Sequence, residues 1–241
     1  MPGSLLATPY PSAAEWKKLV EEFSPEAIAH KLLLSHVPYV FRDEPLKFAL
    51  FRKTIADAFD VEPSNVFIVG SAMAGRSLKG KSIEKAYSSK SDIDTLIVSE
   101  HLFTTYVMKS LAWIKDCTKP DFTTKPHPTS PSVAADKTKH IFWLADSAHK
   151  GIWRPDSLPP EADARNEFFD KFSAVSLKTL GLQLSEDTVA KVNGRVARSF
   201  DDAVRDLTSS LSRLRKEFRN EPVEPEVDPS DVDMTASQKE G

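Results

Sequence analysis

The first 60 residues carry apolar positions at helical spacing, and prolines divide them into separate runs. Ser24 and Pro25 form a start signal for a second helix that covers 27–34, and Pro45 opens a third helix. The apolar stripes are Trp16, Leu19, Val20 and Phe23 in the first run, and Phe48, Phe51, Ile55 and Phe59 in the last. This spacing predicts three amphipathic helices before residue 61.

The hydrophobic period then changes from helical to extended. Residues 65–69 form a compact apolar run that stops at Gly70, which is typical of a buried strand. Residues 71–78 have helical composition, and 79–91 are rich in serine and lysine, which predicts a long flexible loop. A second strand is predicted over 92–98. Its two faces carry Ile93, Thr95 and Ile97 on one side, and Asp92, Asp94 and Leu96 on the other.

The second half of the chain reads mainly as helix. Apolar spacing predicts helices over 101–115, 137–149, 162–180 and 200–218. Residues 188–198 alternate only weakly, so they fit either a strand or the start of the last helix.

These elements predict an α/β (α+β) fold with a small mixed β-sheet and flanking helices at both ends. We divide the chain into an N-terminal helical segment at 13–60, a core at 61–135 with both strands, and a mainly helical part at 136–219. Residues 220–241 are acidic, contain proline and have almost no large apolar side chains. Such a segment buries too little surface to fold, so a disordered tail is predicted.

Composition narrows the classes of function. The net charge is -3 and the pI about 6.1, which argues against a chain-wide basic field for nucleic acid. The single cysteine, Cys117, excludes a disulfide framework and a cysteine-based metal cluster. The N-terminus lacks the pattern of a secretory signal, and no apolar run has the length of a membrane span. We therefore expect a soluble, cytoplasmic protein without a membrane partner.

Two aspartates at the start of the second strand are the strongest chemical signal. Residues two apart on a strand point the same way, so Asp92 and Asp94 present two carboxylates to one face. Two like charges beside a buried strand repel each other and need a compensating cation. Mg²⁺ or Mn²⁺ suits such oxygen ligands, with phosphate oxygens completing the shell. The alternative is that Asp-x-Asp is only a solvated strand end.

A turn and a basic segment precede this pair. Gly70 permits a sharp turn after the first strand, and Ser71 adds a hydroxyl, so backbone N–H groups there suit a phosphate oxygen. Taken alone, a strand that ends in Gly-Ser is common. Arg76 is a further candidate for contacting nucleotide phosphates, together with the spacer residues Lys79, Lys81, Lys85 and Lys90. The alternative is a solvated basic loop.

The motifs FIVGSAMAGRSL and SDIDTLIVS, in this order along the chain, resemble the signature of the polymerase beta type nucleotidyltransferase superfamily. More narrowly, the sequence is similar to bacterial stand-alone nucleotidyltransferase-like proteins with a longer loop between these motifs. The resemblance covers only about residues 66–98. It implies that Gly70 and Ser71 hold a triphosphate, while Asp92 and Asp94 bind magnesium and carry catalysis.

The resemblance also implies a third carboxylate from a later strand, as a general base or metal ligand. The best later segment, 188–198, offers no acid at its alternating positions, which hold Lys191, Asn193 and Arg195. Other acids, each with an ordinary surface interpretation, are Asp146, Asp156 and Asp201. Thr95 also departs from the apolar residue usual after the second aspartate.

The function expected from this resemblance is transfer of a nucleoside monophosphate from a nucleoside triphosphate to an acceptor hydroxyl. The acceptor could be a small molecule, a protein, an RNA end or a second nucleotide. Two alternatives stay open. One is a catalytically impaired, nucleotide-binding regulatory protein of the same fold. The other is a non-enzymatic helical interaction protein in which SDID is only a strand edge.

Overall fold

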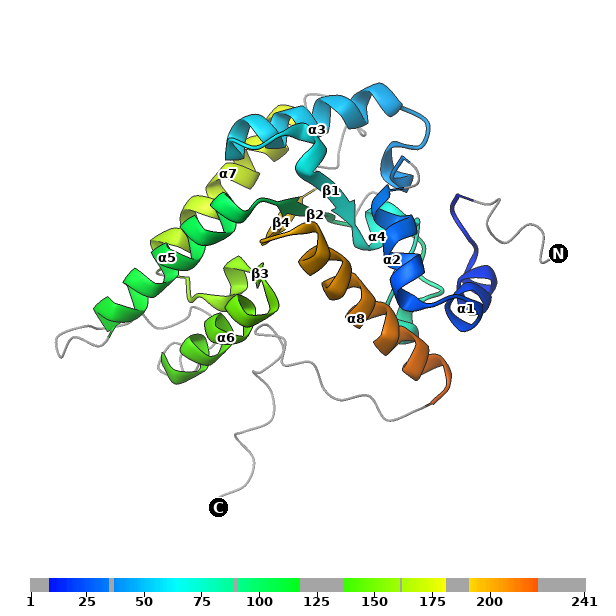
Figure 1. The fold of residues 1–241 in the computed structure, drawn as a ribbon. Coiled ribbons are helices and arrows are strands. Elements are labelled where there is room, and N and C mark those ends of the chain that lie inside the picture. The colour runs from blue at the N-terminus through cyan, green and yellow to red at the C-terminus, as the bar shows by residue number, and fades with distance from the viewer. Residues whose placement is uncertain are drawn as a thin grey trace, which may run out of the picture.

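The computed structural model describes residues 9–34, 37–88, 91–117, 137–160, 162–180 and 191–220. Helices surround a small sheet at its centre (Figure 1). In chain order, the elements that position the site are α1 (Ala13–Glu22), α2 (Pro25–Leu34), α3 (Pro45–Phe59), β1 (Val66–Val69), α4 (Gly70–Ala74), β2 (Ile93–Val98), α5 (Glu100–Cys117), α6 (Lys137–Lys150), β3 (Ile152–Trp153), α7 (Asp163–Leu180), β4 (Val192–Ala197) and α8 (Phe200–Phe218).

Several helices begin where side-chain oxygens can satisfy free backbone N–H groups. Ser12 and Glu15 form a reciprocal capping box at α1. The Ser24 hydroxyl accepts a hydrogen bond from the backbone of Ala27 at 3.1 Å, which confirms the predicted start of α2. Ser199 caps α8 by accepting from the backbone of Asp202. Local chemistry therefore sets these helix boundaries.

The sheet is mixed and has the strand order β1-β2-β4-β3. The outer pairs, β1 with β2 and β3 with β4, are antiparallel, whereas β2 and β4 run parallel. The sheet takes β1 and β2 from residues 61–135 and β3 and β4 from 136–219, so these two segments build one layer. The predicted combination of helices with a small mixed sheet is confirmed.

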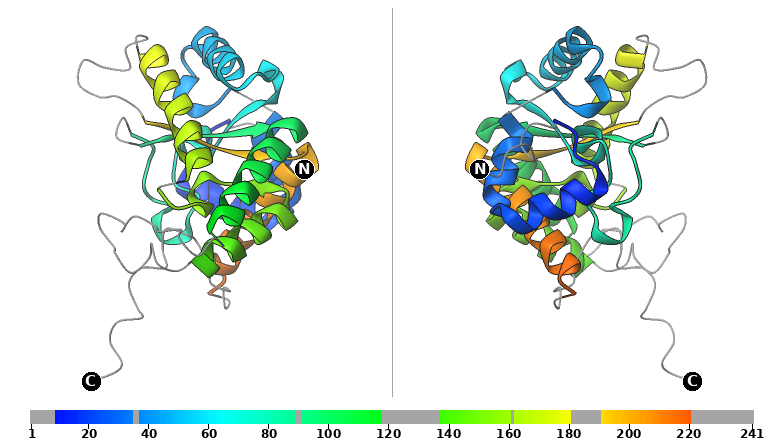
Figure 2. Two further views of the ribbon diagram at one scale, coloured as in Figure 1. Left: turned by 90° about the vertical axis from the view of Figure 1, so that its left-hand side faces the viewer. Right: turned by 90° about the vertical axis from the view of Figure 1, so that its right-hand side faces the viewer.

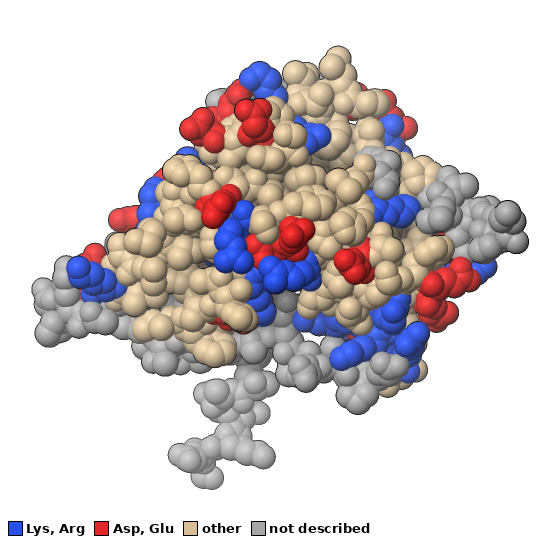
Figure 3. Space-filling model, viewed as in Figure 1, with Lys and Arg blue, Asp and Glu red and all other residues tan. Residues whose placement is uncertain are grey.

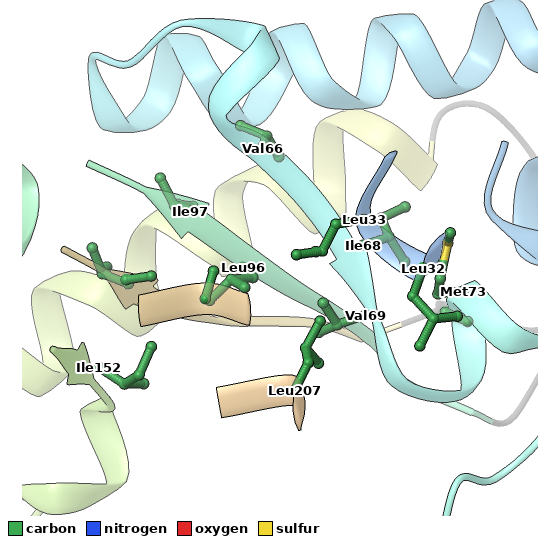
Figure 4. Packing of buried hydrophobic residues seen from close by; sticks show 14 of the residues in the cluster. Leu32, Leu33, Val66, Ile68, Val69, Met73, Leu96, Ile97, Ile152 and Leu207 are labelled. Carbon is green, nitrogen blue, oxygen red and sulfur yellow. The ribbon is translucent and has the colours of Figure 1, made fainter. Parts of the chain in front are cut away.

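The two faces of the sheet are covered by different helices. α3 and α7 lie on one side, and α8 lies on the other (Figure 2). On the α8 side, Val69 and Leu207 point toward one another, and Leu96 lies on the same side of β2 (Figure 4). Val66 and Ile97 point to the opposite side. Most residues on both faces of β1 and β2 are therefore buried, which explains the apolar sequences of these two strands.

Aromatic side chains form the centre of the layer between the sheet and α7. Phe168 is fully buried, and its ring lies 4.9–5.1 Å from the rings of Trp153, Tyr106 and Phe59. Phe172 follows one turn later, with its ring 5.0 Å from that of Phe168. These rings join β3, α5, α3 and α7 into one core.

Gly194 occupies a place in β4 where a side chain has no room. A Cβ at this position would lie 2.3 Å from Phe172 Cζ and 2.5 Å from Thr95 Oγ1. Glycine is usually weak in a strand, but here its absent side chain lets α7 and β2 approach β4 closely. The pairing of β2 with β4 depends on this contact.

The structure corrects one predicted element and adds another. The helix predicted over 71–78 covers only Gly70–Ala74, because Gly75 adopts a left-handed conformation with φ of 78° and ends it. The two-residue strand β3 has no counterpart in the predicted elements. The segment at 188–198, left open between strand and helix, contains β4. Most of the predicted tail, at 221–241, lies outside the described residues.

None of the helices in the described part of the chain has the length and apolar character needed to cross a membrane.

We expect Phe168→Ala to lower the free energy of unfolding by about 3–5 kcal/mol, because it leaves a cavity among four packed rings. Urea unfolding followed by circular dichroism measures this change. The matched control is Phe142→Ala on α6, where the ring is 63% exposed and the expected effect is within about 0.5 kcal/mol. Equal effects of the two substitutions would contradict this description of the core.

Candidate functional site

The pairing of β1 with β2 brings the two sequence motifs into contact. Val69 pairs with Asp94, so Gly70 comes directly after the residue opposite this aspartate. Gly70 has φ of 66°, a left-handed conformation that favours glycine. A Cβ on Gly70 would lie only 3.2 Å from Asp94 Oδ2. The predicted turn and the predicted carboxylate are therefore direct neighbours.

The turn leads into α4, which is shorter than predicted. A helix of five residues has a small macrodipole, so a full helix N-terminus is not what would bind an anion here. The remaining donors are the backbone N–H groups of the turn and the hydroxyl of the half-buried Ser71. Ser71 also anchors the end of α4, since its carbonyl accepts from Gly75 N at 2.9 Å.

The parallel pairing of β2 with β4 places an amide next to the two carboxylates. Asn193 pairs with Asp94, and its Nδ2 donates a hydrogen bond to Asp92 Oδ2 at 3.1 Å. Thr95 Oγ1 donates to the carbonyl of Asn193 at 2.8 Å, and Thr95 is fully buried. The buried Thr95 hydroxyl thus helps to fix the position of Asn193.

Burial dominates the electrostatics of Asp94. Loss of water contact raises the pKa of the Asp94 carboxyl above its usual range, and the charge of Asp92 adds to the effect. Arg195 on β4 and the exposed Lys79 and Lys191 oppose it. In the described residues, these fixed cations do not offset the burial. The ionised carboxylate of Asp94 is therefore not fully stabilised by the positive charges around it.

A second partly buried aspartate on the same side of the sheet has its charge balanced by two arginines. Asp206 on α8 accepts a hydrogen bond from Arg195 Nη2 at 2.7 Å and one from Arg154 Nη2 at 3.2 Å. Burial works to raise the pKa of Asp206, but these two guanidinium groups outweigh it and hold the pKa below its usual range. Arg195 therefore forms a direct hydrogen bond with Asp206, whereas it acts on Asp94 only by a longer-range electrostatic interaction.

Arg76 was predicted to contact nucleotide phosphates, but its guanidinium group contacts backbone carbonyls of the protein. Its Nε donates to the carbonyl of Pro11 at 3.1 Å, and its Nη1 donates to the carbonyl of Ile83 at 3.1 Å. Its backbone also forms an isolated bridge with Ala86. The guanidinium group therefore connects the N-terminal segment to the spacer, and we leave Arg76 out of the site proposed below.

Tyr87 lies close enough to Asp92 and Asp94 to feel both charges, and sequence analysis did not select it. Its backbone N–H donates to the carbonyl of Gly75 at 2.9 Å, and its ring lies 6.1 Å from that of Tyr39. Burial and the charges of Asp92 and Asp94 raise the pKa of Tyr87 to about 12. Its hydroxyl therefore remains a hydrogen-bond donor at neutral pH. The only sequence signal was an aromatic residue in a polar spacer shortly before SDID.

The candidate third carboxylates lie elsewhere. Asp146 forms an ion pair with Lys150 along α6, and Asp156 is half-exposed at the end of the β3 segment. Asp201 follows the C-terminal end of β4, whereas Asn193 and the carboxylate pair are near the N-terminal ends of β4 and β2. Within the described ranges, no group of three histidine, cysteine, aspartate or glutamate side chains is placed to hold a metal ion.

The start of α8 carries a separate group of charges. Asp202 is buried there and accepts hydrogen bonds from Arg198 and from the Ser199 hydroxyl. Arg205 contacts the same carboxylate. Figure 3 shows acidic and basic side chains side by side on this part of the surface. These charges satisfy one another and cap the helix, so they have no role in the site.

We expect Asp94→Asn to raise the free energy of unfolding at pH 7 in the presence of EDTA. The pKa of Asp94 is raised on folding, so its contribution to stability is complete below the unfolded pKa of about 3.9 and is lost as pH rises through the folded value. The uncharged amide avoids that loss. Urea unfolding between pH 4 and 8 should show a gain that disappears toward pH 4.

Asp206→Asn should have the opposite sign at pH 7. The pKa of Asp206 is depressed on folding, so its stabilisation is complete above about pH 4 and is lost as pH falls through the folded value. Removing this charge leaves Arg195 and Arg154 without their carboxylate and should cost about 3 kcal/mol. The same urea series measures it, and equal signs for the two variants would overturn the electrostatic description.

No protein-family model, curated protein or solved structure matches this chain.

Proposed function

We propose that this protein binds a nucleoside triphosphate with Mg²⁺ or Mn²⁺ at Gly70, Ser71, Asp92 and Asp94. In this proposal it transfers the nucleoside monophosphate to an acceptor hydroxyl. The acceptor class stays open between a small molecule, a protein, an RNA end and a second nucleotide. The proposal rests on the site geometry, together with the resemblance of the two motifs to nucleotidyltransferases.

One observation carries this proposal: the carboxylate of Asp94 lies against the backbone of Gly70. A Cβ on Gly70 would crowd Asp94 Oδ2, and the left-handed φ of 66° also disfavours a side chain there, so the turn brings its backbone close to the carboxylate. A ligand at this turn would meet Asp92 two residues before Asp94. A carboxylate pair next to a glycine turn suits a phosphate chain that carries a divalent cation.

The donor set fits such a cation. Asp94 is a partly buried carboxylate whose pKa is raised, mainly because burial removes water and the nearby cations do not offset that loss. Asp92 supplies a second carboxylate, and Asn193 already orients it through one oxygen. Carboxylate oxygens are preferred ligands of Mg²⁺ and Mn²⁺. When bound, the cation would neutralise charge on the phosphate oxygens that leave as pyrophosphate.

The other residues of the site suit the triphosphate. Ser71 and the backbone N–H groups of the turn are neutral donors, and Tyr87 remains protonated at neutral pH. Lys79 and Lys191 are exposed and act on Asp94 through space, so their ammonium groups lie where they can attract the polyphosphate. These groups bind and orient the substrate, which is the main protein contribution to in-line attack.

A second candidate function is nucleotide binding without turnover. It is favoured by Asn193, an uncharged residue at the strand position next to Asp94. An amide has no proton-accepting carboxylate with which to activate an acceptor hydroxyl. This candidate predicts triphosphate binding that depends on the metal but releases no pyrophosphate.

The test measures binding and turnover in the same samples. We expect wild-type protein to bind at least one of the four triphosphates with Mn²⁺ by isothermal titration and to release pyrophosphate over hours. The double variant Asp92→Asn/Asp94→Asn should weaken binding by at least about 10–100-fold, because even outer partners of metal ligands cost that much. Asp146→Asn, a surface ion-pair aspartate on α6, is the matched control and should leave both signals unchanged.

The outcomes separate the candidates. Metal-dependent binding with pyrophosphate release supports transfer, and binding alone selects the second candidate. Equal signals from wild type and the double variant would contradict the site itself, and would favour a helical interaction protein in which SDID is a strand edge.

A further inference from the structure

We propose that β4 makes this a single-cation site: Asn193 and Arg195 occupy the strand side on which a second divalent cation would need a carboxylate. This inference depends on the proposed function, because it concerns the cation that accompanies the triphosphate. In this inference Asn193 positions Asp92. Arg195 keeps a permanent positive charge near Asp94, which disfavours a second cation there.

Asn193 is fixed in place by several independent contacts. Its carbonyl accepts from the buried Thr95 hydroxyl, and the neighbouring Lys191 carbonyl accepts from Ile93 N at 2.8 Å. Gly194 then fits between Phe172 and Thr95, where any side chain would collide. The backbone of β4 therefore has one register relative to β2, and it places the Asn193 amide on the side of the carboxylates.

The amide already satisfies part of Asp92. Asn193 Nδ2 donates to Asp92 Oδ2 at 3.1 Å, so one carboxylate oxygen is bound by a neutral donor. This bond orients Asp92 for one ligand, since a hydrogen-bonded carboxylate keeps its rotamer. The hydrogen bond also occupies an oxygen lone pair of Asp92 that a carboxylate bridging two cations would need.

The next residue on the same face of β4 is positively charged. Arg195 lies two positions after Asn193, and two residues apart on a strand share a face. Its guanidinium is held by Asp206 at 2.7 Å, so its position near the site is fixed rather than variable. Arg195 pairs with Leu96, which lies two residues after Asp94, so its charge is on the same face as the carboxylates. A second divalent cation on this side would meet repulsion from that fixed charge.

Ligand chemistry leads to the same result. Paired divalent cations in phosphoryl chemistry lie about 3.5–4 Å apart and share bridging oxygen ligands. The described site has two carboxylates, and β4 contributes a neutral amide and a cation to the same face. Two carboxylates with phosphate oxygens suffice for one hard cation, whose remaining ligands can be water.

The test counts Mn²⁺ ions bound to the full-length protein with tripolyphosphate, a probe that needs no knowledge of the base. Equilibrium dialysis with metal analysis gives the stoichiometry. Electron paramagnetic resonance shows whether two ions are close enough to couple magnetically. We expect one uncoupled Mn²⁺ per wild-type chain. Asn193→Asp should bind a second ion and show coupling, because it adds the missing carboxylate beside Asp94.

Asn193→Ala is the matched control, since it removes the same amide without adding an acid. It should keep one ion, with about 10–100-fold weaker affinity, because Asp92 loses its orienting partner. Two coupled ions in the wild type would overturn the single-cation inference while leaving the proposed function intact. A folded Asn193→Asp protein with only one ion would overturn the role given to Asn193. If Asn193→Asp fails to fold by circular dichroism, the wild-type count still decides. No bound Mn²⁺ in the wild type would contradict the proposed function, and the inference with it.

Discussion

The parallel pairing of β2 with β4 is the contact on which the rest of the structure depends. It joins residues about a hundred positions apart, with Asp94 next to Asn193. Parallel strands need a long crossover, and here α5, α6, β3 and α7 provide it. The buried Thr95 hydroxyl and the absent side chain of Gly194 fix this register. A shift by one residue would turn Asn193 away from the carboxylates and bury charge against α7.

Much of the fold could be predicted because local chemistry determines it. Ser24 and Ser199 start helices with their own hydroxyl groups, and the run 65–69 is apolar on both faces because helices cover both sides of β1. β4 could not be assigned with equal certainty. Its polar residues share one face with the site, and its central glycine has low strand propensity, so only tertiary packing selects the strand. β3 is too short to produce any period.

Part of the candidate site could likewise be predicted from local sequence, and part could not. Strand periodicity placed Asp92 and Asp94 on one face, and the glycine turn followed from the end of a buried run. The contact between Gly70 and Asp94 needed the β1–β2 register, which is non-local. The sequence alone also could not show that Arg76 and Arg195 have different roles. Arg76 donates to the backbone carbonyls of Pro11 and Ile83, whereas the charge of Arg195 acts on Asp94 because β4 lies beside β2.

Two partly buried aspartates on the same side of this sheet differ in how their negative charge is balanced. Asp206 is balanced by two guanidinium groups held within the protein, so its burial is stable as it stands. Asp94 is also partly buried, but the nearby cations leave its pKa raised, and Asp92 adds a like charge. A carboxylate with a purely structural role would gain from a partner such as the one Asp206 has. Folding leaves Asp94 short of positive charge next to a glycine turn, and this imbalance is the physical basis on which a cation and a phosphate ligand are proposed.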